Sequence, residues 1–203
     1  MGRPAVAPFC LALLGCPLLA ELPQFGVQVA VVQPESDLNG GKWVGGRVGA
    51  SAGVHVLLDL DGGHGLCLRG DATSFRSGPI RLFDGSGSTQ LYGEDAKARI
   101  LALGADYRFH FASSHLEGPY GLLGAGWSWA SLTGAALTEG GPVASWPADQ
   151  RATSFQFALG LGWRFLPQVG CELRYTQSSF RDLGAPGTLM KAPTLSLGLT
   201  LDY

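Results

Sequence analysis

The chain has 203 residues, enough for one sizeable domain, and its formal net charge of −2 gives no electrostatic reason to expect a nucleic acid partner. Charged residues make up only 15% of the sequence, against roughly 25% in ordinary soluble domains, whereas glycine occurs 31 times. This composition excludes a typical soluble surface rich in Lys and Glu, so we expect something other than water to cover part of the protein.

Residues 1–20 have the layout of a secretory signal peptide. Arg3 lies in a basic start, FCLALLGCPLLA forms a short apolar core, and the small residue Ala20 ends the segment. The apolar run is interrupted by Pro17 and is too short to span a bilayer as a helix. The sequence therefore predicts an exported protein, with one barrel domain over residues 21–203.

The cysteines raise a second hypothesis for the leader. Cys16 ends the stretch LLGC, which resembles a bacterial lipobox, so acylation of Cys16 is an alternative to ordinary cleavage by signal peptidase. Cys67 and Cys171 fall on predicted strands with opposite facing, which disfavours a disulfide between them. No pair of cysteines has metal-ligand spacing, and the sequence predicts neither a metal site nor a cofactor.

Eight segments alternate large apolar residues with small or polar ones at a period of two. In TSFQFALGLGWRF, every second position holds a large apolar residue: Phe155, Phe157, Leu159, Leu161, Trp163 and Phe165. This alternation is typical of strands with one apolar face, and no segment shows a convincing helical period. The predicted strands cover residues 25–32, 47–60, 65–75, 99–111, 121–131, 153–165, 169–177 and 194–203.

The connections between these strands alternate strictly in length. The short links DGGHG, ASSHLEG and LPQ alternate with longer polar loops, so an up-and-down barrel has all its long loops at one end. Long extracellular loops and short periplasmic turns are typical of outer-membrane barrels. The predicted fold class is all-β, an eight-stranded antiparallel up-and-down transmembrane β-barrel.

The apolar face of the strands is predicted to point outward into lipid. An eight-stranded barrel has an interior only just wide enough for side chains, so the many Phe, Trp and Leu residues would overfill it. The aromatic residues also form two bands, as they do at the two interfaces of a membrane. The bands contain Tyr107, Phe109, Phe111, Trp163, Phe165 and Tyr203 near the turns, and Trp129, Phe155 and Tyr175 towards the loops.

The inward face then carries charged side chains, which have to pair or form hydrogen bonds in a narrow interior. Basic and acidic residues nearly balance, so we expect a packed salt-bridge network with a structural role and no large open pore; a small ion path is the alternative. Arg164 and Glu172 are expected as diagonal neighbours. His55 is expected close to Asp71 or Arg69. The predicted lumen charge network consists of Arg47, Asp59, Arg69, Asp71, Asp106, Arg108, Arg164, Glu172 and Arg174.

The final segment, PTLSLGLTLDY, combines alternating leucines with a terminal aromatic residue. Leu197, Leu199, Leu201 and Tyr203 look like the C-terminal signal that the barrel-assembly machinery recognises. With its eight alternating strands, the chain over about residues 23–203 resembles the OmpA/OmpX-like family of small outer-membrane β-barrels. That family usually ends in Phe, so Tyr203 is a departure. The resemblance implies a Gram-negative outer membrane, with its lipid and lipopolysaccharide as surroundings and the assembly machinery as a partner.

No catalytic residue is predicted. Some barrels of this kind are lipid-modifying enzymes, and a lipid A deacylase needs a Ser nucleophile with a His base and an acidic group within reach. The nearest stretch, HFASSHLE, contains Ser113, Ser114, His115 and Glu117, but it lacks the His-x-Ser pattern and falls on a predicted periplasmic turn. A barrel enzyme acting on lipid is the alternative function, and a soluble lipocalin-like ligand-binding barrel is a third.

The long loops are the remaining candidates for function, because exposed loops on a rigid scaffold carry binding. SFRSGPIRLFDGSGSTQLYGED includes Phe83 and Tyr92, and PVASWPADQ includes Trp146. These apolar residues either contact a surface partner or pack on each other as a loop cap. We therefore expect an integral outer-membrane barrel with a structural or surface-interaction role, such as adhesion, and a surface protein ligand as the candidate partner of the loops.

Overall fold

The computed structural model describes residues 22–35, 48–60, 62–75, 80–83, 89–92, 97–111, 117–133, 136–138, 150–181, 183 and 189–203. Five sequence predictions fall outside these residues: the signal peptide over 1–20, lipidation at Cys16, the lumen position of Arg47, the turn residues 113–115 and the loop residue Trp146. Within the part of the chain that is described, no helix is long and apolar enough to cross a membrane.

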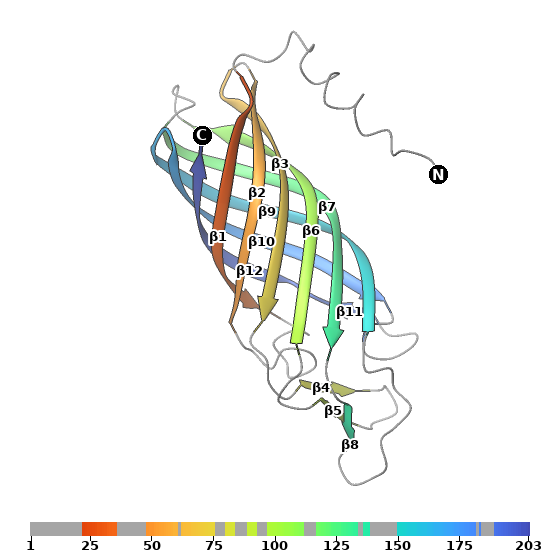
Figure 1. Cartoon of the computed structure of the whole chain (residues 1–203). Helices are drawn as coiled ribbons and strands as arrows, with labels where there is room; N and C mark the ends of the chain where they lie inside the picture. Colours follow the sequence, from red (N-terminus) through yellow and green to blue (C-terminus); the bar gives the residue numbers. More distant parts are fainter. Residues whose placement is uncertain are drawn as a thin grey trace, which may run out of the picture.

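Eight strands form a closed antiparallel barrel, which confirms the predicted fold class (Figure 1). Each strand pairs with its neighbours in chain order, and β1 pairs with β12 to close the sheet. Closure satisfies the backbone polar groups of a sheet without water, as a membrane requires. The barrel strands are β1 (Gln24–Pro34), β2 (Gly49–Leu60), β3 (His64–Phe75), β6 (Lys97–His110), β7 (Gly118–Thr133), β9 (Gln150–Leu166), β10 (Val169–Arg181) and β12 (Thr194–Asp202).

One end of the barrel carries the tight turns and both chain ends of the sheet. Phe25 and Tyr203 exchange two backbone hydrogen bonds there, of 2.7 and 3.2 Å. The turn between β2 and β3 contains Gly62 and Gly63 with φ values of 80° and 86°, a region that glycine enters without steric cost. The consecutive glycines of DGGHG therefore permit this short connection.

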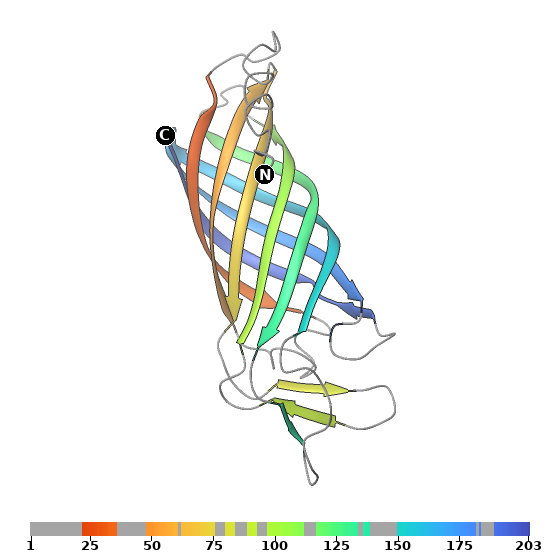
Figure 2. The same cartoon turned by 45° about the vertical axis from the view of Figure 1, so that its right-hand side comes forward.

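The opposite end carries a second, smaller sheet built from two loops (Figure 2). The connection from β3 to β6 forms β4 (Ile80–Phe83) and β5 (Thr89–Tyr92), and the connection from β7 to β9 forms β8 (Ala136–Thr138). β5 lies between the other two strands and pairs antiparallel with both. A further short strand, β11 (Leu189–Lys191), pairs with the end of β10. The sequence patterns did not predict these four strands.

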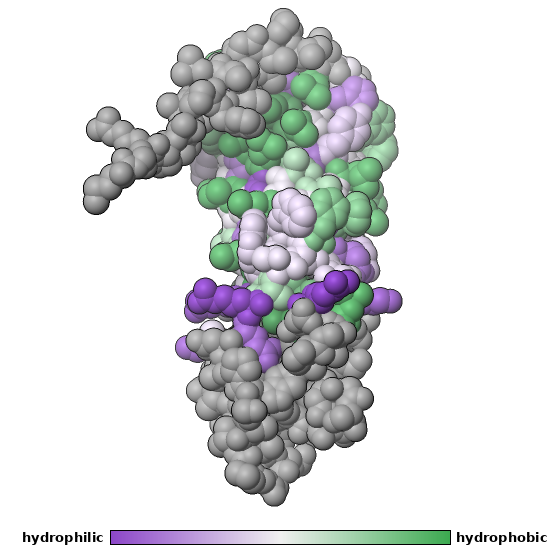
Figure 3. All heavy atoms as spheres, turned by 90° about the vertical axis from the view of Figure 1, so that its right-hand side faces the viewer, coloured by the Kyte–Doolittle hydropathy of each residue, from purple (hydrophilic) through white to green (hydrophobic). Residues whose placement is uncertain are grey.

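The outer wall is apolar, as predicted. On β9, for example, Leu161 is 61% exposed and Trp163 is 49% exposed. The inward residues that alternate with these outward residues are smaller or buried. Figure 3 shows hydrophobic residues spread over the wall between the two ends. A wall of this kind suits contact with hydrocarbon, and its strands of 9 to 17 residues are long enough to cross a bilayer.

Candidate functional site

The lumen holds a set of charged residues that we call the central charge cluster. It comes from three strands, β3, β6 and β10, and is almost completely shielded from solvent. Three arginines and three carboxylates balance one another, which is how charges tolerate a low-dielectric interior. The cluster consists of Arg69, Asp71, Asp106, Arg108, Glu172 and Arg174.

Glu172 is the residue on which the three arginines converge. Its Oε1 accepts a hydrogen bond of 2.7 Å from Nη1 of Arg69, and its Oε2 lies 3.4 Å from Nη2 of Arg108. Nη1 of Arg174 lies 3.8 Å from Oε1, and the Tyr120 hydroxyl donates to Oε2 over 3.3 Å. Three strands separate β3 from β10 in either direction around the barrel, so the Arg69–Glu172 pair spans the lumen from wall to wall.

Asp106 forms the second junction of the cluster. Nη2 of Arg174 donates to its Oδ1 over 2.9 Å, and Nη1 of Arg69 lies 3.3 Å from its Oδ2. Arg69 also donates from Nε to Asp71 over 2.8 Å, and Gln28 donates to the same carboxylate. Each arginine of the cluster thus has a carboxylate partner, and side chains from opposite walls meet in the middle of the barrel.

Five polar residues nearer the turns form a separate group, the turn-end cluster. His55 Nε2 lies 2.5 Å from Oδ1 of Asp202, and Arg164 pairs with the other oxygen of that carboxylate. Arg164 also donates to Gln24 over 3.0 Å, and Gln24 donates to Asp59 over 3.2 Å. This group joins β1, β2, β9 and β12, the strands around the closure of the barrel.

The two clusters divide the residues predicted for one network. Asp59 and Arg164 belong to the turn-end cluster, whereas the other predicted residues within the described ranges belong to the central one. Register places Glu172 opposite Gly162 and Arg174 opposite Gly160, which makes Arg164 a diagonal neighbour of Glu172, as expected. Arg164 nevertheless pairs with Asp202 on β12, because the strand between them, β10, places Gly170, which has no side chain, opposite Arg164.

The expected position of His55 beside Arg69 is confirmed by the register, but the hydrogen bond of its ring goes to a different residue. His55 lies directly opposite Arg69 across the β2–β3 hairpin, but its ring contacts Asp202 on β12. Gly26 on β1 lies between these two residues in the register, opposite both of them. Because Gly26 has no side chain, His55 and Asp202 meet over its backbone; a Cβ atom there would collide with both.

Gly162 likewise leaves space for an inward side chain from a neighbouring strand. It lies opposite Tyr120 on β7, and the Tyr120 ring covers the place that a Cβ atom would take. The ring also packs under the Arg108 guanidinium, 5.1 Å from the ring centre. The inward glycines therefore make room for long polar side chains in a narrow interior.

At the loop end, inward side chains form a buried apolar cluster, the apolar plug, which the sequence patterns did not predict. Phe180 and Leu132 are fully buried there, and Phe75 is 3% exposed. These apolar residues lie on the inward phase of their strands, next to the long loops, where the alternation predicts small or polar residues. That departure from the alternation was the sequence signal that could have predicted the plug. The plug consists of Val32, Phe75, Ala98, Ile100, Ala130, Leu132, Phe180, Leu183, Met190 and Ala192.

A cavity of about 70 Å³ separates the plug from the central charge cluster. Val32 and Ile100 line it on one side, and Arg69, Asp71 and Glu172 on the other. Hydroxyl groups complete its wall, among them those of Ser51, Thr73, Ser178 and Ser196. A polar cavity of this size has room for a few water molecules.

The described residues contain no group of three or more His, Cys, Asp or Glu side chains arranged to hold a metal ion. Cys67 is buried in the lumen wall, whereas Cys171 lies between the outward residues Trp163 and Leu199, so the two thiols face opposite sides of the sheet as predicted. His110, the first residue of HFASSHLE, is buried against the Tyr120 ring at 5.3 Å between ring centres.

Known proteins share this architecture. Among solved structures, the N-terminal β-barrel domain of Pseudomonas aeruginosa OprF is 12% identical with a TM-score of 0.50, and the match covers 90% of this chain and 100% of that chain. Neisserial surface protein A is 14% identical with a TM-score of 0.51, over 89% of this chain and 97% of that one. A comparison with curated proteins finds no match. At these identities the structural matches show a common fold.

The sequence itself also matches a family of such barrels. The match runs over residues 10–202, nearly the whole chain, and the family is described as the outer membrane protein beta-barrel domain. The match agrees with the closed sheet of eight antiparallel strands and with its apolar outer wall. This chain therefore belongs to the family of outer membrane protein β-barrel domains.

Proposed function

We propose that this protein is a closed barrel that presents its loops at the cell surface for attachment to a surface protein ligand, with no pore and no enzymatic activity. The observation that carries the proposal is the small sheet that joins two long loops through β4, β5 and β8. Loops that pair with one another form an ordered surface, and ordered loops on a rigid scaffold suit binding.

The interior supports the same proposal. Ion pairs cross the lumen at Glu172, and the apolar plug closes its loop end. An eight-stranded barrel leaves room for little besides its own side chains. We propose that the lumen charges have a structural role, which leaves the loops as the part of the molecule available to a soluble partner.

A lipid-modifying enzyme is the competing function. It would need a nucleophile and a base where the barrel meets the lipid headgroups. Of the described histidines, His55 is engaged with Asp202 inside the barrel, and His110 is buried against Tyr120. His64 stacks on Tyr107 beside the tight turn. These positions favour a binding role over catalysis.

The two ends of the chain carry features that suit export and insertion into the outer membrane. We propose that residues 1–20 direct export, and that Leu197, Leu199, Leu201 and Tyr203 are recognised by the barrel-assembly machinery. The three leucines are exposed on the outer face of β12, and Tyr203, which directly follows the strand, is exposed as well, so an assembly factor has access to them before the barrel closes against β1.

Attachment is tested with a loop variant that leaves the barrel intact. Leu91 lies in β5 and pairs with Arg81 on one side and Leu137 on the other, so Leu91→Pro breaks the central strand of the loop sheet. Bacteria that express the protein should attach to surfaces coated with extracellular-matrix glycoproteins, and the Leu91→Pro variant should attach at the level of non-expressing cells. Leu91→Val, which preserves strand geometry, is the matched control.

Folding of each variant is checked by its migration in SDS gels before and after boiling. Equal attachment by expressing and non-expressing cells would contradict the proposed role. Attachment that survives in a folded Leu91→Pro variant would show that the loop sheet is not the binding surface.

A further inference from the structure

Four basic residues lie on the outer wall of the barrel, at its loop end, and we call them the basic belt. They occupy the outward phase of β6, β9 and β10, and each is exposed. Figure 3 shows hydrophilic residues gathered in a band at the lower end of the apolar wall. The basic belt consists of Lys97, Arg99, Arg151 and Arg181; Lys191 on β11, which lies opposite Ser179, is also exposed.

The register places two arginines of the belt in one row. Ser131 on β7 is the direct partner of Arg99 on β6 and of Arg151 on β9. Two strand spacings therefore separate the arginines, about 10 Å between backbones. Lys97 lies two residues beyond Arg99, opposite Thr133. Side chains as long as Arg and Lys can converge across this gap on a single anionic group that is seated over Ser131.

The basic belt has no carboxylate partner within the described part of the chain. None of the salt bridges or side-chain hydrogen bonds found there involves Lys97, Arg99, Arg151 or Arg181. Inside the barrel, by contrast, Arg69 alone contacts three carboxylates. The four residues of the basic belt are therefore available to an anion from outside the protein.

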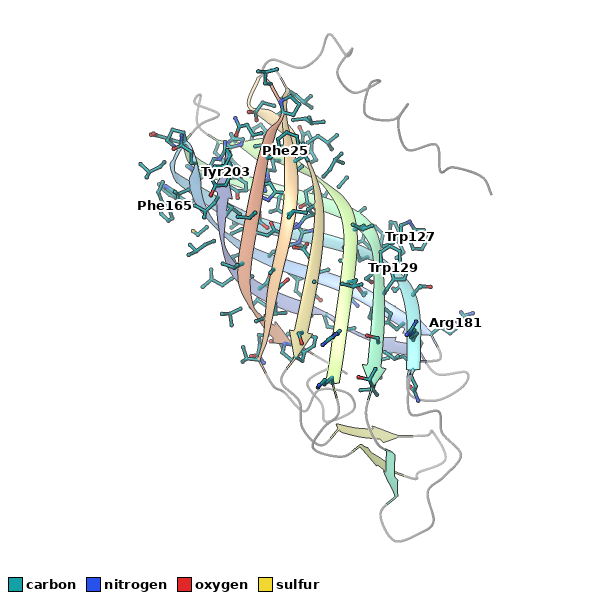
Figure 4. All side chains as sticks on the ribbon, viewed as in Figure 1. Phe25, Trp127, Trp129, Phe165, Arg181 and Tyr203 are labelled. Atoms are coloured by element: carbon teal, nitrogen blue, oxygen red, sulfur yellow. The ribbon has the colours of Figure 1, made fainter. Side chains whose placement is uncertain are left out.

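The belt occurs at one end of the wall only. At the turn end, the described outward residues are aromatic or aliphatic, among them Phe25, Phe165 and Tyr203 (Figure 4). At the loop end, Arg181 points away from the barrel, and Trp127 and Trp129 lie nearer the middle of the wall (Figure 4). Trp129 occupies the row next to Ser131 on β7. A tryptophan at the interface with basic residues just outside it suits a leaflet whose headgroups are anionic.

We propose that the basic belt binds the phosphate groups of lipopolysaccharide in the outer leaflet, with Arg99 and Arg151 as the central pair. The loops mark this end of the barrel as the extracellular one, and lipopolysaccharide presents its lipid A phosphates at the depth where the acyl chains end. Arginine donates paired N–H groups that match the oxygens of a phosphate. The proposal does not depend on the attachment role of the loops.

The test is a binding titration of the folded, full-length barrel in a non-ionic detergent. The probes are bisphosphorylated lipid A and the same lipid with both phosphates removed, and native mass spectrometry counts the bound lipid. Wild-type protein should bind the phosphorylated form more tightly, with a preference that weakens as salt is raised. Each basic residue near an anionic surface contributes roughly fivefold, so Arg99→Gln with Arg151→Gln should weaken binding on the order of 25-fold.

Two controls separate this effect from a loss of folding or of net charge, and a third variant extends the test to the rest of the belt. Arg99→Lys with Arg151→Lys keeps the charge and should retain most of the affinity. Glu117→Gln changes an exposed charge at the turn end and should leave binding unchanged. Lys97→Gln with Arg181→Gln should also weaken binding, because it removes two further positive charges near the lipid phosphates. Equal binding of both lipid forms by wild-type protein, or an unchanged preference in the folded Arg-to-Gln variant, would overturn the proposal.

Discussion

A guanidinium that leaves water loses hydration free energy, and it recovers this only when carboxylates and hydrogen-bond acceptors surround it. Glu172 supplies that compensation to three arginines at once, from a position that is 5% exposed. Arg69 is connected to the same degree, because it contacts Asp71, Asp106 and Glu172. At the scale of residues, Glu172 and Arg69 are where a substitution should cost most.

Replacement of Glu172 by Gln tests this dependence. The amide keeps the shape of the side chain but leaves Arg69, Arg108 and Arg174 with less negative charge, so the free energy of unfolding should fall by about 3–5 kcal/mol. Urea unfolding in lipid vesicles, followed by tryptophan fluorescence, measures the change. The exposed Glu117→Gln variant should stay within about 0.5 kcal/mol of wild type. If Glu172→Gln changed the free energy of unfolding as little as Glu117→Gln, the central charge cluster would contribute little to stability.

A second prediction concerns the contact of His55 with Asp202 over Gly26. In Gly26→Ala the added methyl group would collide with both side chains and separate them, which should lower the free energy of unfolding by about 1–3 kcal/mol. Gly121→Ala is the matched control, because its Cβ would meet only the end of the Phe111 ring, at 3.3 Å. Equal effects in the two variants would mean that crowding over Gly26 is relieved elsewhere.

At the scale of elements, the strands are apolar outside and polar inside, but the apolar wall is not uniform along its length. On β9, Leu161 lies among the apolar outward residues, between Leu159 and Trp163, whereas Thr153 lies in the row of Trp129, next to the row of Arg151. The cost of a charge on the lipid face depends on its depth. Strand β9 should therefore tolerate an added arginine at Thr153 but not at Leu161.

Leu161→Arg and Thr153→Arg make this comparison within one strand. Leu161→Arg should lower the free energy of unfolding by about 2–4 kcal/mol, because Leu161 faces hydrocarbon, and Thr153→Arg by about 0–1 kcal/mol, because it lies near the interface. Unfolding in vesicles of defined thickness provides the measurement. If the two costs were equal, the depth assignment of the wall would be wrong.

At the scale of the whole molecule, three layers of side chains follow one another in the lumen from the turns to the loops: the turn-end cluster, the central charge cluster and the apolar plug. The cavity of about 70 Å³ lies between the second and third layers and is lined by residues of both. Because of these layers, we expect no water-filled channel of the kind that forms the interior of a porin.

The closed lumen predicts an electrical outcome. After insertion into a planar bilayer, the wild-type protein should give no stepwise ion conductance, because ion pairs between opposite walls and the plug obstruct the path. A large bacterial porin in the same apparatus is the positive control, and protease protection of the inserted barrel verifies its presence. Discrete conductance steps that depend on the protein would favour the small ion path over the plugged barrel.

Much of this architecture follows from local sequence. The period-two alternation predicted the eight barrel strands, and the Phe and Leu residues of TSFQFALGLGWRF lie on the outer wall as expected. The alternation of loop lengths predicted an end with tight turns. The strand ends were underestimated, since β7 begins at Gly118 and β10 continues to Arg181, where the sequence pattern is weaker. The loop sheet was missed because its strands are only three or four residues long.

The facing of each strand was thus determined by the sequence alone, because in a β-strand adjacent side chains point to opposite sides whatever the rest of the chain does. The partners inside the lumen were decided only by the tertiary structure. Asp202 reaches His55 because β1 closes the sheet between their strands and offers Gly26, and Glu172 reaches Arg69 because the barrel is narrow enough for opposite walls to touch. Closure and width are properties of the whole sheet, and no single segment encodes them.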